Sequence, residues 1–396
     1  MKLNKILSDA VFSLAGTCVS IGVLQFFVLP WTNVAMNDPK AYGLAVAYIS
    51  FFGILPTTFG GTLNNIRLIR IKDYDTSSGD YNPLLLILLA LCILSTPLVS
   101  IWTEKRIDIS SVCYNALAAS LILANDYFIA EFRVKLNFKN VFIYNVILSA
   151  GYLAGFLIFR FYSVWQFIYI MGYFLSGLFL FAKTGFWREP VKITKYFKGT
   201  LSDLANLTVS NFLYRSLNYA DKLLLYPLMG GEAVSVIFAA TFFTKILSMA
   251  ITPINGLVLS YLSKLKYKPD RLFGKILLFG SILCIIGYFA CLFAAKPILM
   301  LLYENYASEA MKFIGLTAAS TMVATFNSMI NPFTLQFCPT KWQIAINGVT
   351  MFSYVVFAYW LLNIWGLWGF CLAMVLSRFI RLGIMLFVYY FRPKNR

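Results

Sequence analysis

Histidine is absent from the 396 residues, and charged residues make up only 12% of them. The lack of histidine excludes the commonest general base and the commonest zinc ligand. Soluble domains have about a quarter charged residues, because their surface must be solvated. Half that fraction cannot cover a globule of this size, so the apolar majority, 60% of the chain, is expected to face lipid.

The cysteines do not indicate a functional site either. The seven cysteines are odd in number and scattered, and no two form a CxxC pair. This pattern predicts neither a disulfide framework nor a metal site. We therefore expect no cofactor and no catalytic centre, and the chain is not predicted to be an enzyme.

The net charge of +17 does not indicate a nucleic-acid partner, because the cations sit in short loops between apolar runs. A span needs about 20 mainly apolar residues to cross the hydrocarbon core. Such runs predict an all-α membrane protein of about 12 transmembrane helices, the first of them uncleaved. The expected spans are 10–30, 41–63, 83–102, 109–130, 141–159, 164–182, 202–228, 233–260, 273–294, 310–335, 344–362 and 365–389.

The loop cations predict the orientation of these spans. With a cytoplasmic N-terminus, the inner segments hold 22 of the 33 Lys and Arg residues and the outer loops hold 6. Because cytoplasmic loops carry the excess of Lys and Arg, both termini are expected in the cytoplasm.

The two halves of the chain resemble each other. Leu7-Ser8-Asp9-Ala10 opens the first span, and Leu201-Ser202-Asp203-Leu204 opens the seventh. Both halves would start on the cytoplasmic side, as in transporters built from parallel repeats. We expect two six-helix bundles, residues 1–198 and 199–396, related by a pseudo-two-fold axis along the membrane normal.

Five cations fall inside expected spans and away from their ends: Arg215, Lys222, Lys245, Arg378 and Arg381. A charged group facing lipid at the bilayer centre costs at least about 2.5–3.5 kcal/mol, so these side chains should face other helices or a water-filled cavity. The only acids well inside are Asp126 and Asp221. The positive excess favours a cavity for an anion, in which the arginine fork matches phosphate oxygens.

Polar residues accompany these cations at helical spacing. Asn211, Arg215, Asn218 and Lys222 fall on one face of the seventh span, and Lys245 lies in a similar stripe on the eighth. Such stripes are also normal where helices pack together. Asp126 and Asp221 could neutralise the cations in structural pairs, and Arg381 could extend to the inner interface.

The segment Asn218-Tyr219-Ala220-Asp221-Lys222-Leu223-Leu224-Leu225 resembles a charged segment of bacterial polysaccharide flippases. These are the O-antigen and capsule translocases, which act in capsule and lipopolysaccharide synthesis. They belong to the multidrug/oligosaccharidyl-lipid/polysaccharide exporter superfamily. The Ala41-Tyr42-Gly43 turn, the segment Pro253–Gly256 and the segment Leu262–Leu265 fit the same family.

The resemblance implies two bundles around a cationic central cavity, in a bacterial inner membrane. It implies transport of an undecaprenyl-diphosphate-linked oligosaccharide to the outer leaflet by alternating access. A polysaccharide polymerase and a chain-length regulator would be candidate partners, beside membrane lipid. Only Arg215, Asp221 and Lys222 match the family's segment. Lys245, Arg378 and Arg381 rest on the cavity argument.

Two other functions remain open on the sequence. A multidrug or organic-cation antiporter would share the architecture, but it should have more buried carboxylates than Asp126 and Asp221. A membrane-embedded polymerase or glycosyltransferase should have a sizeable outer loop for its chemistry, and the expected outer loops are short.

Overall fold

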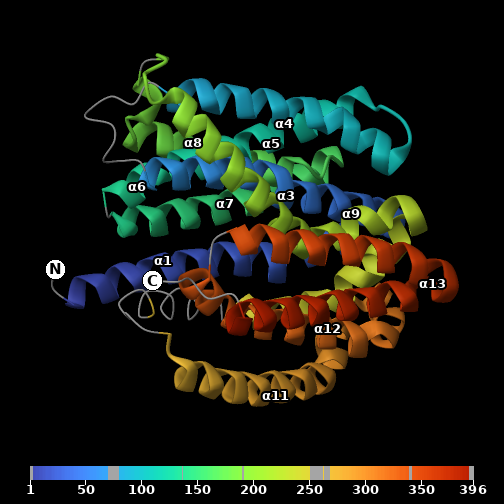
Figure 1. Cartoon of the computed structure of the whole chain (residues 1–396). Helices are drawn as coiled ribbons and strands as arrows, with labels where there is room; N and C mark the ends of the chain where they lie inside the picture. Colours follow the sequence, from blue (N-terminus) through green and yellow to red (C-terminus); the bar gives the residue numbers. More distant parts are fainter. Residues whose placement is uncertain are drawn as a thin grey trace. The chain divides into compact units, whose positions relative to one another are not determined.

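A computed structural model describes residues 3–69, 80–135, 137–189, 191–249, 262, 268–338 and 341–391. These residues are helical almost throughout, and no strand occurs among them (Figure 1). The chain divides into two compact units. Unit 1 contains Met1–Arg215 and Lys222–Gly231, and unit 2 contains Ser216–Asp221 and Glu232–Arg396. The all-α fold class is thus confirmed, whereas the count of 12 helices and the division at 198/199 stay predictions.

Unit 1 begins with a longer helical run than the sequence predicted. The first span was expected to end at residue 30, but the run reaches Met36 and ends at Asn37, which has φ 47°. Asparagine is one of the few residues that adopt this left-handed conformation readily. The helices are α1 (Leu3–Gly22), the π-helix η1 (Val23–Val28), α2 (Leu29–Met36), α3 (Pro39–Ile69), α4 (Tyr81–Glu104), α5 (Ile109–Phe128), α6 (Ala130–Val134), α7 (Phe138–Tyr162), α8 (Phe167–Lys183) and the 3₁₀ turn η2 (Phe186–Arg188).

Figure 1 shows α1, α3, α4, α5 and α7 running side by side in unit 1. Glycines allow a close approach between α7 and α8: a methyl group on Gly155 would lie 2.4 Å from the Phe167 carbonyl oxygen. The same applies between α1 and α7 at Gly16, beside which Ser20 donates a hydrogen bond to Asn145 Oδ1 at 2.9 Å. In α1, therefore, Gly16 and Ser20 serve helix packing.

The long helix α9 (Phe197–Met249) breaks at Gly230, which has φ 82°. The predicted turn between the seventh and eighth spans, residues 229–232, contains this break. Within unit 1 the turn packs on the start of α3. A methyl group on Gly43 would lie 1.8 Å from the Gly231 carbonyl oxygen, and one on Gly231 would lie 2.3 Å from the Lys40 carbonyl oxygen. Only residues without a β-carbon permit this approach.

Unit 2 holds the rest of α9 together with α11 (Asp270–Leu302), α12 (Glu304–Phe337) and α13 (Lys341–Phe391). α13 breaks at Trp365 and Gly366, where the sequence predicts the end of one span and the start of the next. The core of unit 2 is aromatic at one end. There the Phe273 and Tyr389 rings stack with their centroids 3.8 Å apart, and the Phe333 ring packs edge-on against Phe273 at a centroid distance of 5.2 Å.

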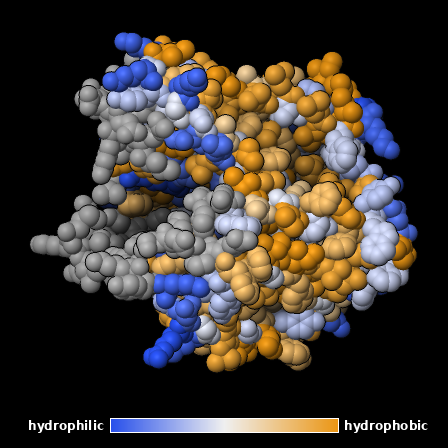
Figure 2. Space-filling view, in the orientation of Figure 1, coloured by the Kyte–Doolittle hydropathy of each residue, from blue (hydrophilic) through white to orange (hydrophobic). Residues whose placement is uncertain are grey.

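The helix surfaces are suited to lipid. Nine helical stretches among the described residues are long and apolar enough to cross a membrane, and α8 is a shorter apolar helix. Large apolar side chains stand exposed along them, for example Leu94 on α4 at 67% and Phe293 on α11 at 83%. Figure 2 shows apolar residues over most of the visible face, with hydrophilic residues gathered towards its edges. Water would penalise this surface, whereas a bilayer would solvate it.

Candidate functional site

The predicted polar stripe lies on α9, which is helical from Phe197 to the break at Gly230. Asn211, Arg215, Asn218 and Lys222 follow one another at intervals of four, three and four residues, so they share one side of the helix. The stripe runs through both units, because the segment Ser216–Asp221 belongs to unit 2 and its neighbours on either side belong to unit 1.

In unit 1, Arg215 is held close to α3. The preceding turn is fixed by Asn211, whose Nδ2 donates to Thr62 Oγ1 at 3.1 Å. A methyl group on Gly61 would lie 3.6 Å from Arg215 Nη2, an ordinary van der Waals distance, so the guanidinium lies beside the α3 backbone. Arg215 is half-buried. Among the described residues its side chain has no hydrogen bond and no ion pair.

Asp126 lies in the last turn of α5 and interacts electrostatically with Arg215 and with Arg133. α3 packs tightly on this turn: a methyl group on Gly60 would lie 2.7 Å from Asp126 Cβ, and Asn64 Nδ2 donates to the Asp126 carbonyl oxygen at 2.9 Å. The predicted neutralising partner is therefore near Arg215, but within the described part of the chain the two side chains form no ion pair within 4.0 Å.

In unit 2, Arg378 on α13 reaches the backbone of α9. Its Nη2 donates to the Leu217 carbonyl oxygen and lies 3.4 Å from Asn218 Oδ1. α12 holds the same residue from another side, since Asn327 Nδ2 donates to the Arg378 carbonyl oxygen at 2.9 Å. The sequence predicted Arg378 and Asn218 as separate cavity residues; in the structure they contact each other.

The other interior charges are buried. Asp221 and Lys222, adjacent on α9, are 5% and 2% exposed, and Arg381 on α13 is 5% exposed. Asp221 interacts electrostatically with Tyr354 and Cys371 of α13. Lys222 and Arg381 both take part in further interactions within the structure.

Lys245 was predicted as a substrate-binding cation, and its backbone belongs to α9, but its side chain lies outside the described residues. Of the stripe around it, Thr241 is described. Its hydroxyl donates to the Ile237 carbonyl oxygen of its own helix at 2.9 Å, and it is 1% exposed.

Sequence reasoning missed a charged cluster at one end of unit 1. It treated Arg67 as a loop cation, but Arg67 lies in the last turn of α3 and is 6% exposed. Its guanidinium bonds to the Tyr127 hydroxyl and forms an ion pair with Glu189, and it lies 4.9 Å from the centroid of the Tyr81 ring. The polar spacing at Asn64 and Arg67 on α3 was the one signal for this burial.

The connector after α8 is fastened to the same end of unit 1. The Asp80 carboxylate accepts from the Thr194 backbone N–H at 2.6 Å. Glu131 Oε2 accepts from the Gly185 N–H at 2.6 Å, and Asn82 Nδ2 donates to the Glu189 carbonyl oxygen at 2.7 Å. The sequence showed this stretch only as a polar linker, whereas the structure makes it a fixed part of unit 1.

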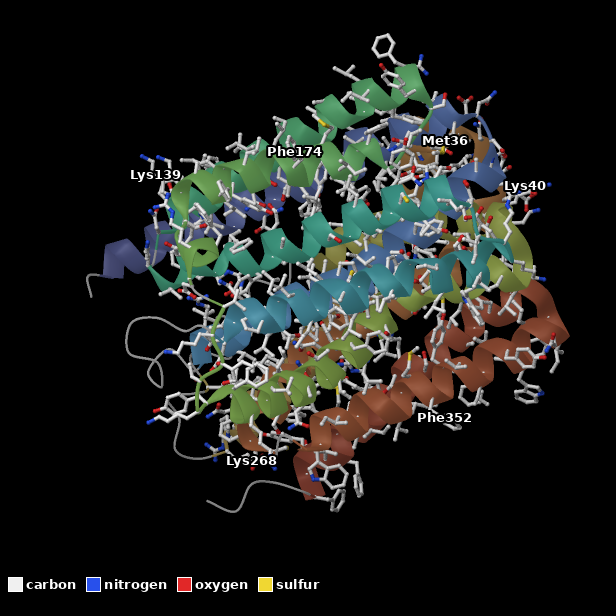
Figure 3. The ribbon with its side chains drawn as sticks, turned by 90° about the horizontal axis from the view of Figure 1, so that it is seen from above. Met36, Lys40, Lys139, Phe174, Lys268 and Phe352 are labelled. Carbon is white, nitrogen blue, oxygen red and sulfur yellow. The ribbon has the colours of Figure 1, made fainter. Side chains whose placement is uncertain are left out.

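The predicted orientation requires Lys139 and Lys40 to lie at opposite ends of unit 1. Figure 3 shows them there, with Met36 beside Lys40 and Phe174 of α8 between the two ends. Which end faces the cytoplasm stays a prediction.

Comparisons with known proteins were made on sequence and on structure. No protein-family model matches the sequence, and no curated protein matches it. Among solved structures, the lipid II flippase MurJ in its inward closed conformation superposes with a TM-score of 0.77 at 16% identity, over 95% of this chain and 87% of that one.

Multidrug transporters share the arrangement as well. An inward-facing MATE transporter of the MOP superfamily gives a TM-score of 0.64 at 14% identity, over 95% of this chain and 97% of its own. The bent form of the Vibrio cholerae transporter VcmN gives 0.57 at 13% identity, over 97% of both chains. The chain has the fold of these transporters.

The shared fold and the apolar helices make the chain a multi-pass membrane protein. At these identities the likeness shows the fold alone. Because a flippase and multidrug transporters share that fold, the substrate has to be argued from the residues of the site.

Proposed function

We propose that the chain is a lipid-linked oligosaccharide flippase. It would move an undecaprenyl-diphosphate-linked glycan of the O-antigen or capsule class from the cytoplasmic to the outer leaflet of a bacterial inner membrane, by alternating access. Arg215, Lys222, Lys245, Asn211 and Asn218 are the proposed substrate-binding residues on α9. Asp221 and Asp126 are proposed to balance charge or to couple transport to an ion. Arg381 remains a candidate on α13.

The surroundings of Arg215 carry this proposal. The residue is half-buried on α9, and within the described residues it has neither a hydrogen bond nor an ion pair. A guanidinium has five N–H donors, and leaving them unmet away from bulk water is costly. The free-energy cost is smaller if the guanidinium lies on a water-exposed surface where an anion can bind. The planar fork fits the oxygens of a phosphate.

The charge balance favours an anion over a cation. Away from the ends of the predicted spans lie five Lys and Arg residues and two Asp residues. A diphosphate carries about two negative charges, which cannot enter hydrocarbon unless they are solvated or paired. Bound cations would offset that cost, while the polyprenyl chain stays in lipid. The fold also occurs in a lipid II flippase, so it is compatible with a lipid-linked substrate.

The multidrug antiporter remains the second candidate, and one feature favours it. Asp221 is a buried carboxylate beside Tyr354 and Cys371, and a buried acid could serve a coupling proton or a cationic drug. The same fold occurs in multidrug transporters.

Deletion of the gene separates the two candidates. As a flippase, its loss should abolish a surface polysaccharide and leave the lipid-linked precursor on the inner leaflet, with unchanged sensitivity to cationic dyes. Accessibility of the precursor to a lectin in spheroplasts measures the first effect, with plasmid-borne wild type as the control. Changed dye sensitivity with an intact surface glycan would favour the antiporter instead.

A further inference from the structure

Arg378 and Arg215 differ in the groups that their side chains contact. Its Nη2 donates to the Leu217 carbonyl oxygen and lies 3.4 Å from Asn218 Oδ1, so one end of the guanidinium is taken up by α9. Both acceptors belong to the short α9 segment Ser216–Asp221, which packs with unit 2. Arg215, one residue before that segment, shows no such contact with the described residues.

The base of the Arg378 side chain is fixed as well. Asn327 Nδ2 donates to its backbone carbonyl oxygen at 2.9 Å, so α12, α13 and α9 meet at this residue. A charged donor makes a stronger hydrogen bond to a neutral acceptor than a neutral donor does. The planar guanidinium fixes direction as well as distance, which an ammonium does not.

The charge of Arg378 is also compensated nearby. Tyr354 interacts electrostatically with both Asp221 and Arg378, so all three lie in one neighbourhood of unit 2. Asp221 ends the α9 segment that Arg378 holds. An anionic residue at this place stabilises the half-buried guanidinium without any substrate.

We propose that Arg378 is a positioning residue, which tethers the α9 segment Ser216–Asp221 to α13, rather than a ligand of the substrate. The segment lies between Arg215 and Lys222, so holding its backbone sets the direction in which those two side chains leave the helix. The positioning of Arg215 and Lys222 for a substrate rests on the proposed function, whereas the tether between Arg378 and the α9 segment does not.

The tether is tested first without substrate, by thermal unfolding of the purified protein in detergent. Arg378→Gln and Asn218→Ala should each lower the melting temperature by about 2 °C or more, and the double variant should lose clearly less than the sum. Arg271→Gln, on the exposed start of α11, is the matched control and should leave it unchanged. Additive losses would overturn the tether. If Arg378→Gln does not fold, Arg378→Lys replaces it in the same cycle.

The role is tested next with undecaprenyl diphosphate as the probe. Arg378→Lys should keep the stabilisation that the probe gives the wild type, with a half-maximal concentration within about twofold. It should still lower the maximal transport rate, because a lysine keeps the charge but loses the fork. Arg215→Ala should lose the probe response. Loss of the response in Arg378→Lys at an unchanged melting temperature would show that Arg378 is a ligand.

Failure of the proposed function gives a different result. If the wild-type protein shows no response to undecaprenyl diphosphate, the flippase proposal fails. The unfolding cycle of Arg378 and Asn218 still decides the tether in that case, because it involves no substrate.

Discussion

Arg215 and Arg378 look alike in the sequence, since each is an arginine within an apolar run. Their surroundings separate them. Arg215 lies beside a glycine and has no hydrogen bond among the described residues, whereas Arg378 bonds to the α9 backbone. Charge alone therefore does not assign a role to an interior cation. The number of its donors that the protein itself satisfies is the better guide.

Arg215→Ala should reduce glycan export strongly while the protein still inserts. The change removes a charge-assisted bond to a phosphate, worth about 1.5–3 kcal/mol, which corresponds to about 10- to 150-fold in substrate affinity. Arg215→Lys should recover part of the activity, because it keeps the charge without the fork. Export per unit of membrane protein is the measurement. Arg160→Ala, an exposed residue at the end of α7, is the control. Normal export in Arg215→Ala would contradict the cationic site.

Glu189→Gln should destabilise unit 1. The change leaves the Arg67 guanidinium buried, with 7% of its side chain exposed, and breaking a buried ion pair costs about 3–5 kcal/mol. We expect about 3 kcal/mol, because Glu189 itself is 18% exposed. The free energy of unfolding in denaturant measures it. Glu309→Gln is the control: its pair with Lys312 is 55–60% exposed, so the loss should stay below about 1 kcal/mol. Equal losses in the two variants would contradict a stabilising role for the cluster.

At the scale of elements, α9 is the part of the chain that joins the proposed site to the fold. It carries the polar stripe, breaks at Gly230 and packs alternately with unit 1 and unit 2 along its length. Glycines account both for the break in α9 and for the close packing of this turn on α3. Gly230 has a positive φ, and Gly231 faces Gly43 at backbone contact.

Gly43→Ala should disturb the docking of this turn on α3. The added methyl group would lie 1.8 Å from a backbone oxygen that cannot rotate away, and overpacking of this kind costs about 1–3 kcal/mol. We expect a lower melting temperature and lower transport. Gly22→Ala is the matched control, since nothing lies within 4 Å of its added methyl group and alanine favours a helix by about 1 kcal/mol. A Gly43→Ala protein as stable as Gly22→Ala would show that α3 and the turn can separate freely.

At the scale of the whole molecule, the loop cations predict how the chain lies in its membrane. Reporter fusions at Asp38, Glu104 and Glu232 should report outside, and fusions at Ser77, Lys192 and Lys266 inside, because inner segments hold the excess of Lys and Arg. Alkaline phosphatase and green fluorescent protein fusions give opposite signals and control each other. Consistent inside signals from the first group would contradict the 12-span topology, and with it the proposed bundles 1–198 and 199–396.

Much of the fold could be predicted, and the site only in part. Apolar runs predicted the helices. The predicted turn at 229–232 contains the break at Gly230, and the break at Trp365 and Gly366 lies within two residues of the turn predicted at 363–364. The extension of the first helix to Met36 was not predicted, because α2 continues past the predicted end at residue 30 through the polar residues Thr32 and Asn33. The spacing of Asn211 to Lys222 predicted a shared helix face. The spacing could not show that Arg378 bonds to this helix, because Arg378 and Asn218 lie 160 residues apart in sequence.

The sequence by itself determined that the protein faces lipid, that it is helical, and that Lys and Arg outnumber Asp within its apolar runs. These features follow from composition and from the length and spacing of the apolar runs. Only the tertiary structure decided which charges have protein partners. It placed Glu189 against Arg67, and the α9 backbone against Arg378, while Arg215 stayed beside Gly61. The physical reason is that an ion pair or hydrogen bond depends on a few ångströms between residues far apart in the chain, which no local pattern encodes.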